Sequence, residues 1–346
     1  MTPLPENNFT RTFRKLEDTR QKYFPGVCVA VTIGIAASFL SQEYGAPAML
    51  MALLLGLAFN FLSQVPMCLP GLELSAKTIL RLGVAMLGLR ITFSDVLTLG
   101  WVPLLMVCSA VVLTIGFGIL MARLLGFSSA FGTLTGGSVA ICGASAAMAI
   151  NSVLPQTEQT KRETLFTVIS VTTLSTLAMI FYPMLSSSLN LSTQDAGLFL
   201  GATIHDVAQV VGAGYSISNE VGDLSTFVKL VRVAMLVPIV MTIGILIRRA
   251  ARQRGEGSQG KTVAIPGFLI GFVALFIINS LGWIPTVVSA PLANSSSWLL
   301  LTAIAALGVR TQLKDILSVG WKPVLLMILE TLFIAGFVIS YILIVR

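Results

Sequence analysis

The chain has 346 residues, of which 55% are hydrophobic and only 11% are charged, and its mean hydropathy is +0.90. A typical soluble domain carries about 25% charged residues, so this chain has too few to cover a surface in water. These values exclude a soluble enzyme, a nucleic-acid-binding protein and a disordered tail. The apolar residues arrive in runs of about 16 to 24, which cross a hydrocarbon core roughly 30 Å thick, and they predict a polytopic membrane protein.

The formal net charge of +7 is concentrated in two segments. Residues 1–22 hold five basic and three acidic residues, and residues 248–261 hold five basic residues and one acidic residue. Basic segments beside membrane spans stay in the cytoplasm, so we expect both on that side. They are typical topology signals and, without interleaved aromatic residues, do not indicate a nucleic-acid surface. Residues 1–22 also lack the apolar core and cleavage site of a signal peptide, so we expect an uncleaved cytoplasmic N-terminus.

We expect an all-α fold with about eleven transmembrane helices, separated by glycine, proline and charge breaks. The predicted spans, in chain order, are residues 24–40, 46–62, 75–90, 101–123, 130–151, 163–184, 194–215, 226–248, 265–282, 296–310 and 321–345. An even number of crossings separates the two basic segments, so one topology satisfies both. That topology places the C-terminus outside.

An internal repeat relates residues 88–103 to residues 308–323 at a constant offset of 220. The identical residues are Gly88, Arg90, Asp95, Leu97, Gly100, Trp101 and Pro103, which meet Gly308, Arg310, Asp315, Leu317, Gly320, Trp321 and Pro323. The second to fourth spans would then duplicate the ninth to eleventh with opposite orientation. Inverted-topology repeats are the architecture of secondary transporters. The alternative is two unrelated polar hairpins that share a helix start.

The fifth span is unusually rich in small and polar residues. Its glycines 136, 137 and 143 weaken the helix, and its small polar residues Ser138, Cys142 and Ser145 would share one helix face. Such a segment can unwind within a membrane only where its backbone groups meet a cavity, an ion or protein. We therefore predict a broken helix whose second half directs its amide end at an anion. Close helix packing through small residues is the alternative.

The seventh span holds the single histidine of the sequence, His205, followed by Asp206 and Gln209, and the i, i+4 spacing would place His205 and Gln209 on one helix face. Ionisable groups at membrane depth are costly and mark functional sites by default. Burial favours the uncharged form of each group, so His205 and Asp206 could exchange a proton. The alternative is a structural clasp with Gln209 between helices. One histidine cannot supply a zinc ligand set or a catalytic triad, so we expect no metal, no cofactor and no enzyme activity.

The eighth span begins with two cations, Lys229 and Arg232, on one helix face. Arg232 is a candidate partner for a bound anion or for Asp206. Lys229 could serve the same site or, alternatively, extend to the membrane surface. Pro238 is expected to bend this span. The four cysteines have no C-x-x-C spacing, so neither a disulfide framework nor a metal site follows.

Four segments resemble the bacterial YeiH family, membrane proteins to which sulfate export is usually attributed. They are SVAICGASAAMA at 138–149, GATIHDVAQVVGAG at 201–214, KLVRVAMLVP at 229–238 and AALGVRTQL at 305–313, and the similarity runs from about residue 24 to residue 346. That family is similar to the group that includes sodium/proton antiporters and bile-acid sodium symporters. The resemblance implies a panel domain, a core domain with crossed discontinuous helices, and an elevator-like movement of the core.

The resemblance also implies where substrate binds. It places the substrate region on Gly136, Gly137, Ser138, Cys142, Gly143 and Ser145, and on His205, Asp206 and Gln209. The repeated hairpins would belong to the scaffold. Related folds usually repeat five helices in order, whereas the match here pairs the second to fourth spans with the ninth to eleventh.

Together these features predict a secondary transporter, and more specifically an exporter of a small anion such as sulfate, sulfite or an organic sulfonate. The anion would bind between Ser138 and Ser145 with charge from Arg232 or Lys229, while His205 and Asp206 couple its passage to protons or to a cation such as sodium. The sequence has no nucleotide-binding loop, so ATP-driven pumping is not expected. A passive anion channel is the alternative, and a membrane sensor or scaffold is a weaker one.

We expect the following organisation in a bacterial plasma membrane, with a homodimer as a compatible assembly. A cytoplasmic segment, residues 1–23, precedes a transmembrane domain, residues 24–346, which a basic cytoplasmic loop at 249–264 interrupts. Panel-like helices lie at about 46–123 and 265–345, and core-like helices at about 130–248.

Overall fold

The computed structural model describes residues 8–44, 48–94, 100–155, 157–253, 267–311 and 321–345. Every regular element among these residues is a helix, which confirms the all-α class. Six helices are long and apolar enough to cross a membrane: Arg20–Tyr44, Trp101–Leu124, Glu158–Ser188, Asn219–Ile247, Pro291–Arg310 and Trp321–Val345. Shorter apolar helices occupy Ala48–Ala58 and Gly267–Ser280. The prediction of a polytopic helical membrane protein holds for the described residues, and the count of eleven crossings stays a prediction.

The chain divides into two compact units, the first formed by residues 1–83 and 295–311. Its elements are α1 (Asn8–Tyr44), α2 (Ala48–Ala58), the 3₁₀-helix η1 (Asn60–Gln64), α3 (Leu69–Leu74), the π-helix η2 (Ser75–Ile79), the start of α4 (Leu80–Met86) and the end of α15 (Thr286–Arg310). Gly56 of α2 faces Gly308 of α15 so closely that a Cβ on either would overlap the other helix's backbone. The Asn60 side chain stabilises this contact between α2 and α15, because its Nδ2 donates to the carbonyls of Val309 and Thr311, at 2.7 and 2.9 Å.

The second unit comprises residues 84–294 and 312–346 and holds every candidate site residue. Its elements are η3 (Leu87–Leu89), α6 (Trp101–Leu124), α7 (Ser129–Ala140), α8 (Ala144–Asn151), α9 (Glu158–Ser188), α10 (Thr193–Thr203), α11 (Val207–Tyr215), α12 (Asn219–Ala234), α13 (Leu236–Gln253), α14 (Gly267–Ser280) and α16 (Trp321–Val345), with the start of α15. The finer division into panel-like and core-like helices stays a prediction.

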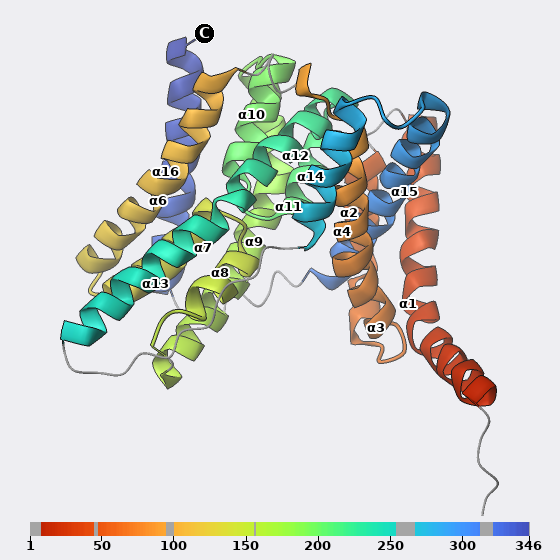
Figure 1. The fold of residues 1–346 in the computed structure, drawn as a ribbon, viewed down its shortest axis with the longest axis horizontal. Helices are drawn as coiled ribbons and strands as arrows, with labels where there is room; N and C mark the ends of the chain where they lie inside the picture. Colours follow the sequence, from red (N-terminus) through yellow and green to blue (C-terminus); the bar gives the residue numbers. More distant parts are fainter. Residues whose placement is uncertain are drawn as a thin grey trace, which may run out of the picture. The chain divides into compact units, whose positions relative to one another are not determined.

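Two of the predicted spans are pairs of short helices in this unit. The span at 130–151 is α7 followed by α8, and the span at 194–215 is α10 followed by α11 (Figure 1). Each half is far shorter than the roughly 20 residues that a membrane crossing requires. Both pairs are therefore discontinuous helices.

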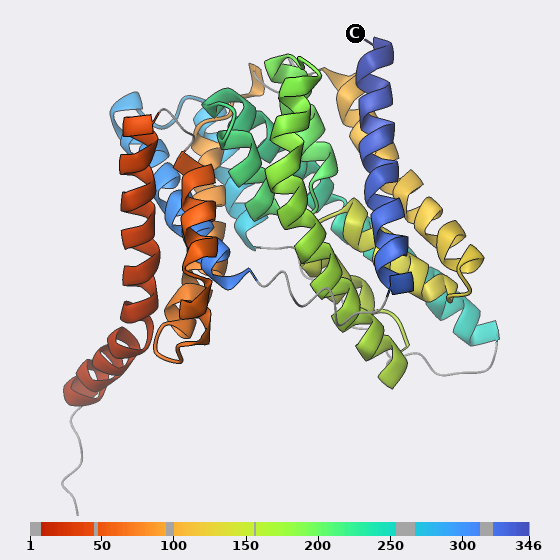
Figure 2. The ribbon, with the colours of Figure 1, turned by 180° about the vertical axis from the view of Figure 1, so that it is seen from behind.

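Long helices pack around these pairs. α6 and α16 lie side by side in both views of the ribbon (Figures 1 and 2), and each also packs against α7. Gly118 of α6 meets Gly132 and Gly136 of α7, where a Cβ on Gly118 would lie 2.9 Å from the backbone of each. Small residues allow membrane helices to approach in this way.

The eighth predicted span has a one-residue turn close to Pro238, where a bend is predicted. α12 ends at Ala234 and α13 begins at Leu236, with the turn at Met235 between them. Proline has no N–H to bond the carbonyl four residues earlier, which here is that of Ala234. The helical hydrogen bonding is therefore interrupted one turn before the proline, within the continuous apolar span Asn219–Ile247.

The predicted repeat falls partly outside the described residues. Asp95 and Leu97 of the first copy, and Asp315, Leu317 and Gly320 of the second, are not among them. The inverted-topology repeat stays a prediction.

Candidate substrate site at two helix breaks

The first break separates α7 from α8 at Ile141–Gly143. Gly143 has φ +63° and ψ −126°, a conformation essentially restricted to glycine, and it begins α8 without any side-chain cap. Helix first-turn amides have no partner within their own helix. The predicted broken helix is thus present, with its break at Gly143.

The glycine doublet does not make the break. Gly136 and Gly137 lie inside the continuous α7, where a Cβ on Gly136 would lie 3.1 Å from Ile115 Cα and one on Gly137 would overlap Ile150. For these two residues the structure supports the close-packing alternative. The predicted common face of Ser138, Cys142 and Ser145 is wrong, because the helix ends at Ala140 and the periodicity stops there.

The second break separates α10 from α11 at Ile204–Asp206. Ile204 is extended, with φ −65° and ψ 139°, and the Asp206 side chain caps α11 by accepting from the Ala208 N–H at 2.9 Å. The backbone N–H of Asp206 donates to Ser175 Oγ of α9 at 3.0 Å. His205 therefore lies in a non-helical link, and the predicted common helix face of His205 and Gln209 is wrong.

The two breaks lie beside each other, and we call residues 141–143 and 204–206 the helix crossing. His205 Nδ1 is 3.1 Å from the carbonyl oxygen of Val139 in the last turn of α7. A Cβ on Gly143 would be 3.6 Å from the carbonyl oxygen of His205. The backbone ends of four half-helices thus meet in one place.

Lys229 of α12 is fully buried at the helix crossing. Its ammonium donates to three carbonyl oxygens: those of Ile141 and His205 at 2.6 Å and that of Ile204 at 2.8 Å. An ammonium has three hydrogens, so these bonds use all of them. The alternative in which Lys229 extends to the membrane surface is wrong, because its side chain turns inward to the unpaired carbonyls of both breaks.

Arg232 lies one helical turn further along α12 and is equally buried. Its Nε donates to the Ala140 carbonyl at 2.7 Å and its Nη2 to the Val139 carbonyl at 2.8 Å. Its Nη1 donates to the carbonyls of Gly201 and Ile204, at 3.0 and 2.9 Å. These four bonds pair the last turns of α7 and α10, whose dipoles are negative there. Direct binding of an anion by Arg232 or Lys229 stays a prediction.

His205 is completely buried and bonded through both ring nitrogens. Nδ1 faces the Val139 carbonyl, which can only accept, so Nδ1 carries a hydrogen. Nε2 is 3.0 Å from Thr331 Oγ1 of α16, and that hydroxyl also lies 2.8 Å from the Met327 carbonyl. The Thr331 hydroxyl has one hydrogen, which it can donate either to Nε2 of His205 or to the Met327 carbonyl. Which of the two accepts it depends on whether Nε2 is protonated.

Helix α9 is rich in hydroxyl groups, one of which, that of Ser175, bonds the helix crossing at Asp206. Thr164, Thr167, Thr172, Thr173 and Thr176 each donate to a carbonyl of their own helix one turn earlier. Thr176 also accepts from Gln209 Nε2 at 3.5 Å. Gln209 Oε1 is buried and has no hydrogen-bond partner among the described residues. A buried amide oxygen without a partner is costly and is typical of a site that a ligand or water completes.

Not all predicted site residues are equally accessible. Ser138 and Cys142 are buried, and the Ser138 hydroxyl donates to the Leu134 carbonyl at 2.5 Å. Ser145, in the first turn of α8, is exposed, and Asp206 is half-buried. The exposed and half-buried members of the predicted site, Ser145 and Asp206, therefore lie at the amide ends of α8 and α11.

Sequence reasoning missed Glu330, which is fully buried near the middle of α16. Its Oε1 accepts from the Thr135 hydroxyl of α7 at 2.7 Å, and its Oε2 has no partner among the described residues. The available signal was a single acidic residue within a 25-residue apolar helix.

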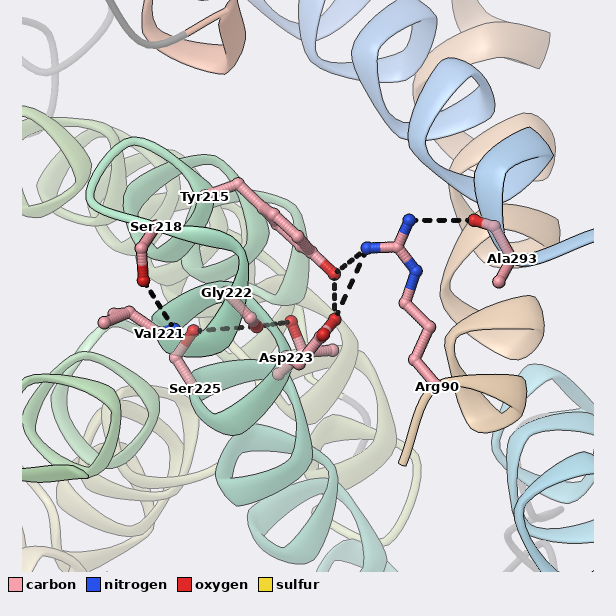
Figure 3. A network of polar contacts seen from close by, with 9 residues as sticks. Arg90, Tyr215, Ser218, Val221, Gly222, Asp223, Ser225 and Ala293 are labelled. Carbon is pink, nitrogen blue, oxygen red and sulfur yellow. Dashed lines mark hydrogen bonds and ion pairs between the residues drawn. The ribbon is translucent and has the colours of Figure 1, made fainter. Parts of the chain in front are cut away.

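A second polar cluster lies at the end of α11 (Figure 3). Arg90, just after η3, donates to Tyr215 OH at 3.4 Å and to the Ala293 carbonyl of α15 at 2.9 Å. Its Nη1 is 3.7 Å from Asp223 Oδ1 of α12, and Tyr215 also donates to that carboxylate. Arg90 belongs to the repeated motif of the sequence, and it connects η3 and α15 to the helices that follow the second break.

These features define a helical membrane protein in which two buried cations and a buried histidine meet at two helix breaks. A family model described as Conserved hypothetical protein 698 matches residues 25–327, so the chain belongs to that family, the UPF0324 or YeiH-type membrane proteins. No solved structure matches the chain.

Three relatives illustrate the similarity. A UPF0324 membrane protein of Chlorobaculum tepidum is 50% identical over 320 residues, which cover 92% of this chain and 89% of the relative. The UPF0324 membrane protein TauZ of Paracoccus denitrificans is 51% identical over 317 residues, covering 91% and 93%. Another, from Rhizobium meliloti, is 41% identical over 334 residues, covering 96% and 95%. The resemblance predicted from the four sequence segments is confirmed.

Proposed function

We propose that this protein is a secondary active transporter that exports a small anion such as sulfate, sulfite or an organic sulfonate. The observation that carries the proposal is the helix crossing, where both carbonyl ends are bonded to the cations of α12. This arrangement leaves the amide end of α8 as the open half-helix end, because the Asp206 side chain caps α11. Discontinuous helices of this kind bind anionic groups at their amide ends in secondary transporters.

The charge at the helix crossing also favours an anion. Lys229 and Arg232 bring two positive charges, and Asp206 brings one negative charge at the start of α11. Asp206 already caps α11, whereas α8 begins at Gly143 without a side-chain cap. The anion would therefore bind at the first turn of α8, beside Ser145.

The bonds of α12 also support an elevator-like movement. Lys229 and Arg232 tie the link regions of both discontinuous helices to α12, so these helices would move as one body. His205 and Asp206 would couple this movement to protons or a cation. Two of the relatives carry the name TauZ, so taurine, an aminosulfonate, belongs among the first substrates to test.

The test is flux of labelled sulfate, sulfite and taurine in proteoliposomes, with and without gradients of pH and sodium. Saturable flux that a gradient accelerates is the expected result. Currents that follow voltage alone would instead identify an anion channel, and binding of a partner without any flux would identify a sensor or scaffold.

A substitution pair tests the proposed anion position. Ser145→Asp places a carboxylate at the open amide end of α8, and we expect it to raise the KM for the anion at least about tenfold by charge repulsion. Thr193→Asp is the matched control, because Thr193 is an exposed residue at the amide end of α10, one half-helix away from the helix crossing. Equal KM values for the two variants would rule out the α8 site.

A further inference from the structure

The carboxyl group of Glu330 has no role in the site described above. It lies in α16 between α6 and α7, where a Cβ on Gly118 would collide with Oε1, so only a glycine leaves room for it. Its single bond to the described residues is the one from the Thr135 hydroxyl. The other oxygen is buried and has no partner within the described part of the chain.

No cation of the described residues pairs with this carboxyl group. α16 packs against α6, α7, α9 and α10. Arg123 of α6 donates to Ser129 at the start of α7, and the charged residues of α9, Glu158, Lys161, Arg162 and Glu163, lie in its first two turns. The other titratable residues on these helices are Cys108 of α6, Tyr182 of α9, whose ring packs against Phe199, and Asp195 in the first turn of α10.

Two titratable groups of the described residues face α16: His205 contacts Thr331, the residue after Glu330, and Asp195 interacts with Tyr341, about three turns further along the helix. An ionised carboxylate in such surroundings is very costly, whereas a neutral carboxylic acid is tolerated. The site therefore favours a bound proton.

The hydrogen bonding of Thr135 changes with the protonation state of Glu330. Its hydroxyl lies 2.7 Å from Glu330 Oε1 and 3.1 Å from the Phe131 carbonyl, and it has one hydrogen to share between them. When Glu330 is ionised, the hydroxyl donates to the carboxylate. When Glu330 binds a proton, the carboxylic O–H can donate to Thr135, whose hydrogen then turns to Phe131 within α7.

The same arrangement recurs one residue along α16. Thr331 can donate to neutral His205 at Nε2 or, once His205 is protonated there, accept from it and donate to the Met327 carbonyl. Both threonine hydroxyls stand between a titratable group and a helix carbonyl. Each connects α16 with a discontinuous helix, Thr135 on α7 and His205 after α10.

We propose that Glu330 is a proton-binding site, and that its proton, together with that of His205, couples α16 to the two discontinuous helices. Proton binding at Glu330 stands on its own geometry, and the coupling role rests on the proposed transport function. The bound species is a proton in either case, so the coupling ion would be H⁺.

Infrared spectroscopy of the purified protein in membranes tests proton binding without any substrate. We expect the carbonyl stretching band of a buried protonated carboxyl group at neutral pH in the wild type. Glu330→Gln should remove this band, and Glu158→Gln should not, because the Glu158 side chain is 90% exposed and a matched control. An identical band in wild type and Glu330→Gln would overturn the proposal.

A second variant, Thr135→Val, provides the infrared test if Glu330→Gln fails to fold. This variant retains the shape of the side chain and removes its hydroxyl, so the carboxyl group loses its hydrogen bond. The carbonyl band should then move to higher frequency. A band that does not move in Thr135→Val would show that it arises elsewhere and would also overturn the proposal.

Flux measurements test the coupling role separately. We expect Glu330→Gln to exchange labelled anion across the membrane without a gradient, and to lose most of the acceleration that a pH gradient gives the wild type. Acceleration equal to that of the wild type would overturn the coupling role. Absence of flux from the wild type would refute the proposed function and leave the infrared result on Glu330 standing.

Discussion

Arg232→Met should be among the most destabilising single changes in this protein. It leaves the carbonyls of Ala140 and Gly201 without their side-chain donor, and that of Val139 with His205 Nδ1 alone, and all three residues are buried. Hydrogen bonds to a charged group contribute about 1.5–3 kcal/mol each. The contributions of the four Arg232 bonds do not add fully, because the surrounding structure relaxes when the side chain is replaced. Leaving a buried acceptor without a hydrogen bond costs about 1–3 kcal/mol, so for the two carbonyls that lose their side-chain donor we expect a loss of about 3–5 kcal/mol.

That loss corresponds to a fall in melting temperature of about 6–10 °C, at roughly 2 °C per kcal/mol for a chain of this size. The melting temperature can be measured in detergent with a maleimide that becomes fluorescent when it reacts with a thiol. The thiol of Cys142 at the helix crossing is only 5% exposed, so it reacts fully only after the protein unfolds. Arg232→Lys, which keeps the charge and loses the fork of donors, should be intermediate.

Arg123→Met is the matched control for this measurement. Arg123 is exposed, and its guanidinium donates to the Ser129 hydroxyl. If Arg232→Met lowers the melting temperature no more than Arg123→Met does, the reasoning about carbonyl pairing is wrong.

Three further predictions concern the breaks and the cluster around Arg90. Gly143→Ala should cost about 1–3 kcal/mol of stability through backbone strain alone, whereas Gly116→Ala, which meets no atom within 4 Å, should be neutral or stabilising; equal melting temperatures would refute the strain. Asp206→Asn should leave the melting temperature nearly unchanged, because asparagine caps helices equally well, yet alter the response of flux to a pH or sodium gradient; an unaltered response would remove Asp206 from coupling. A double-mutant cycle of Arg90→Gln and Asp223→Asn, read by thermal unfolding, should give a coupling of about 0.5–1 kcal/mol, because the pair is partly exposed and 3.7 Å apart; a value near zero would show that the contact contributes nothing.

Much of the fold was predictable because apolar runs of membrane length report the helices directly. The broken fifth span was also predictable, since a run of glycine and small polar residues has few other uses within a membrane. Its exact position was not, because Gly136 and Gly137 serve packing against α6 and α8, and only the positive φ of Gly143 marks the break. Glycine composition cannot distinguish these two uses.

The second break and the partners of the α12 cations were harder to predict. The residues themselves stand out in the sequence, because charges are rare in the apolar runs. Their bonds go to main-chain carbonyls of distant helices, and a carbonyl has no sequence signature. Only the family resemblance implied a second discontinuous helix, although Asp206 is a recognisable cap for α11.

The position of α12 in the chain has a consequence for biogenesis. α7 and α10 are synthesised before Lys229 and Arg232, so their carbonyl ends reach the membrane ahead of the side chains that bond them. Until α12 is inserted, those carbonyls must be served by water or by the insertion machinery, since lipid offers no donor. The helix crossing is therefore a late step of assembly, and a nascent chain that ends before residue 229 should remain an unfinished, protease-sensitive intermediate.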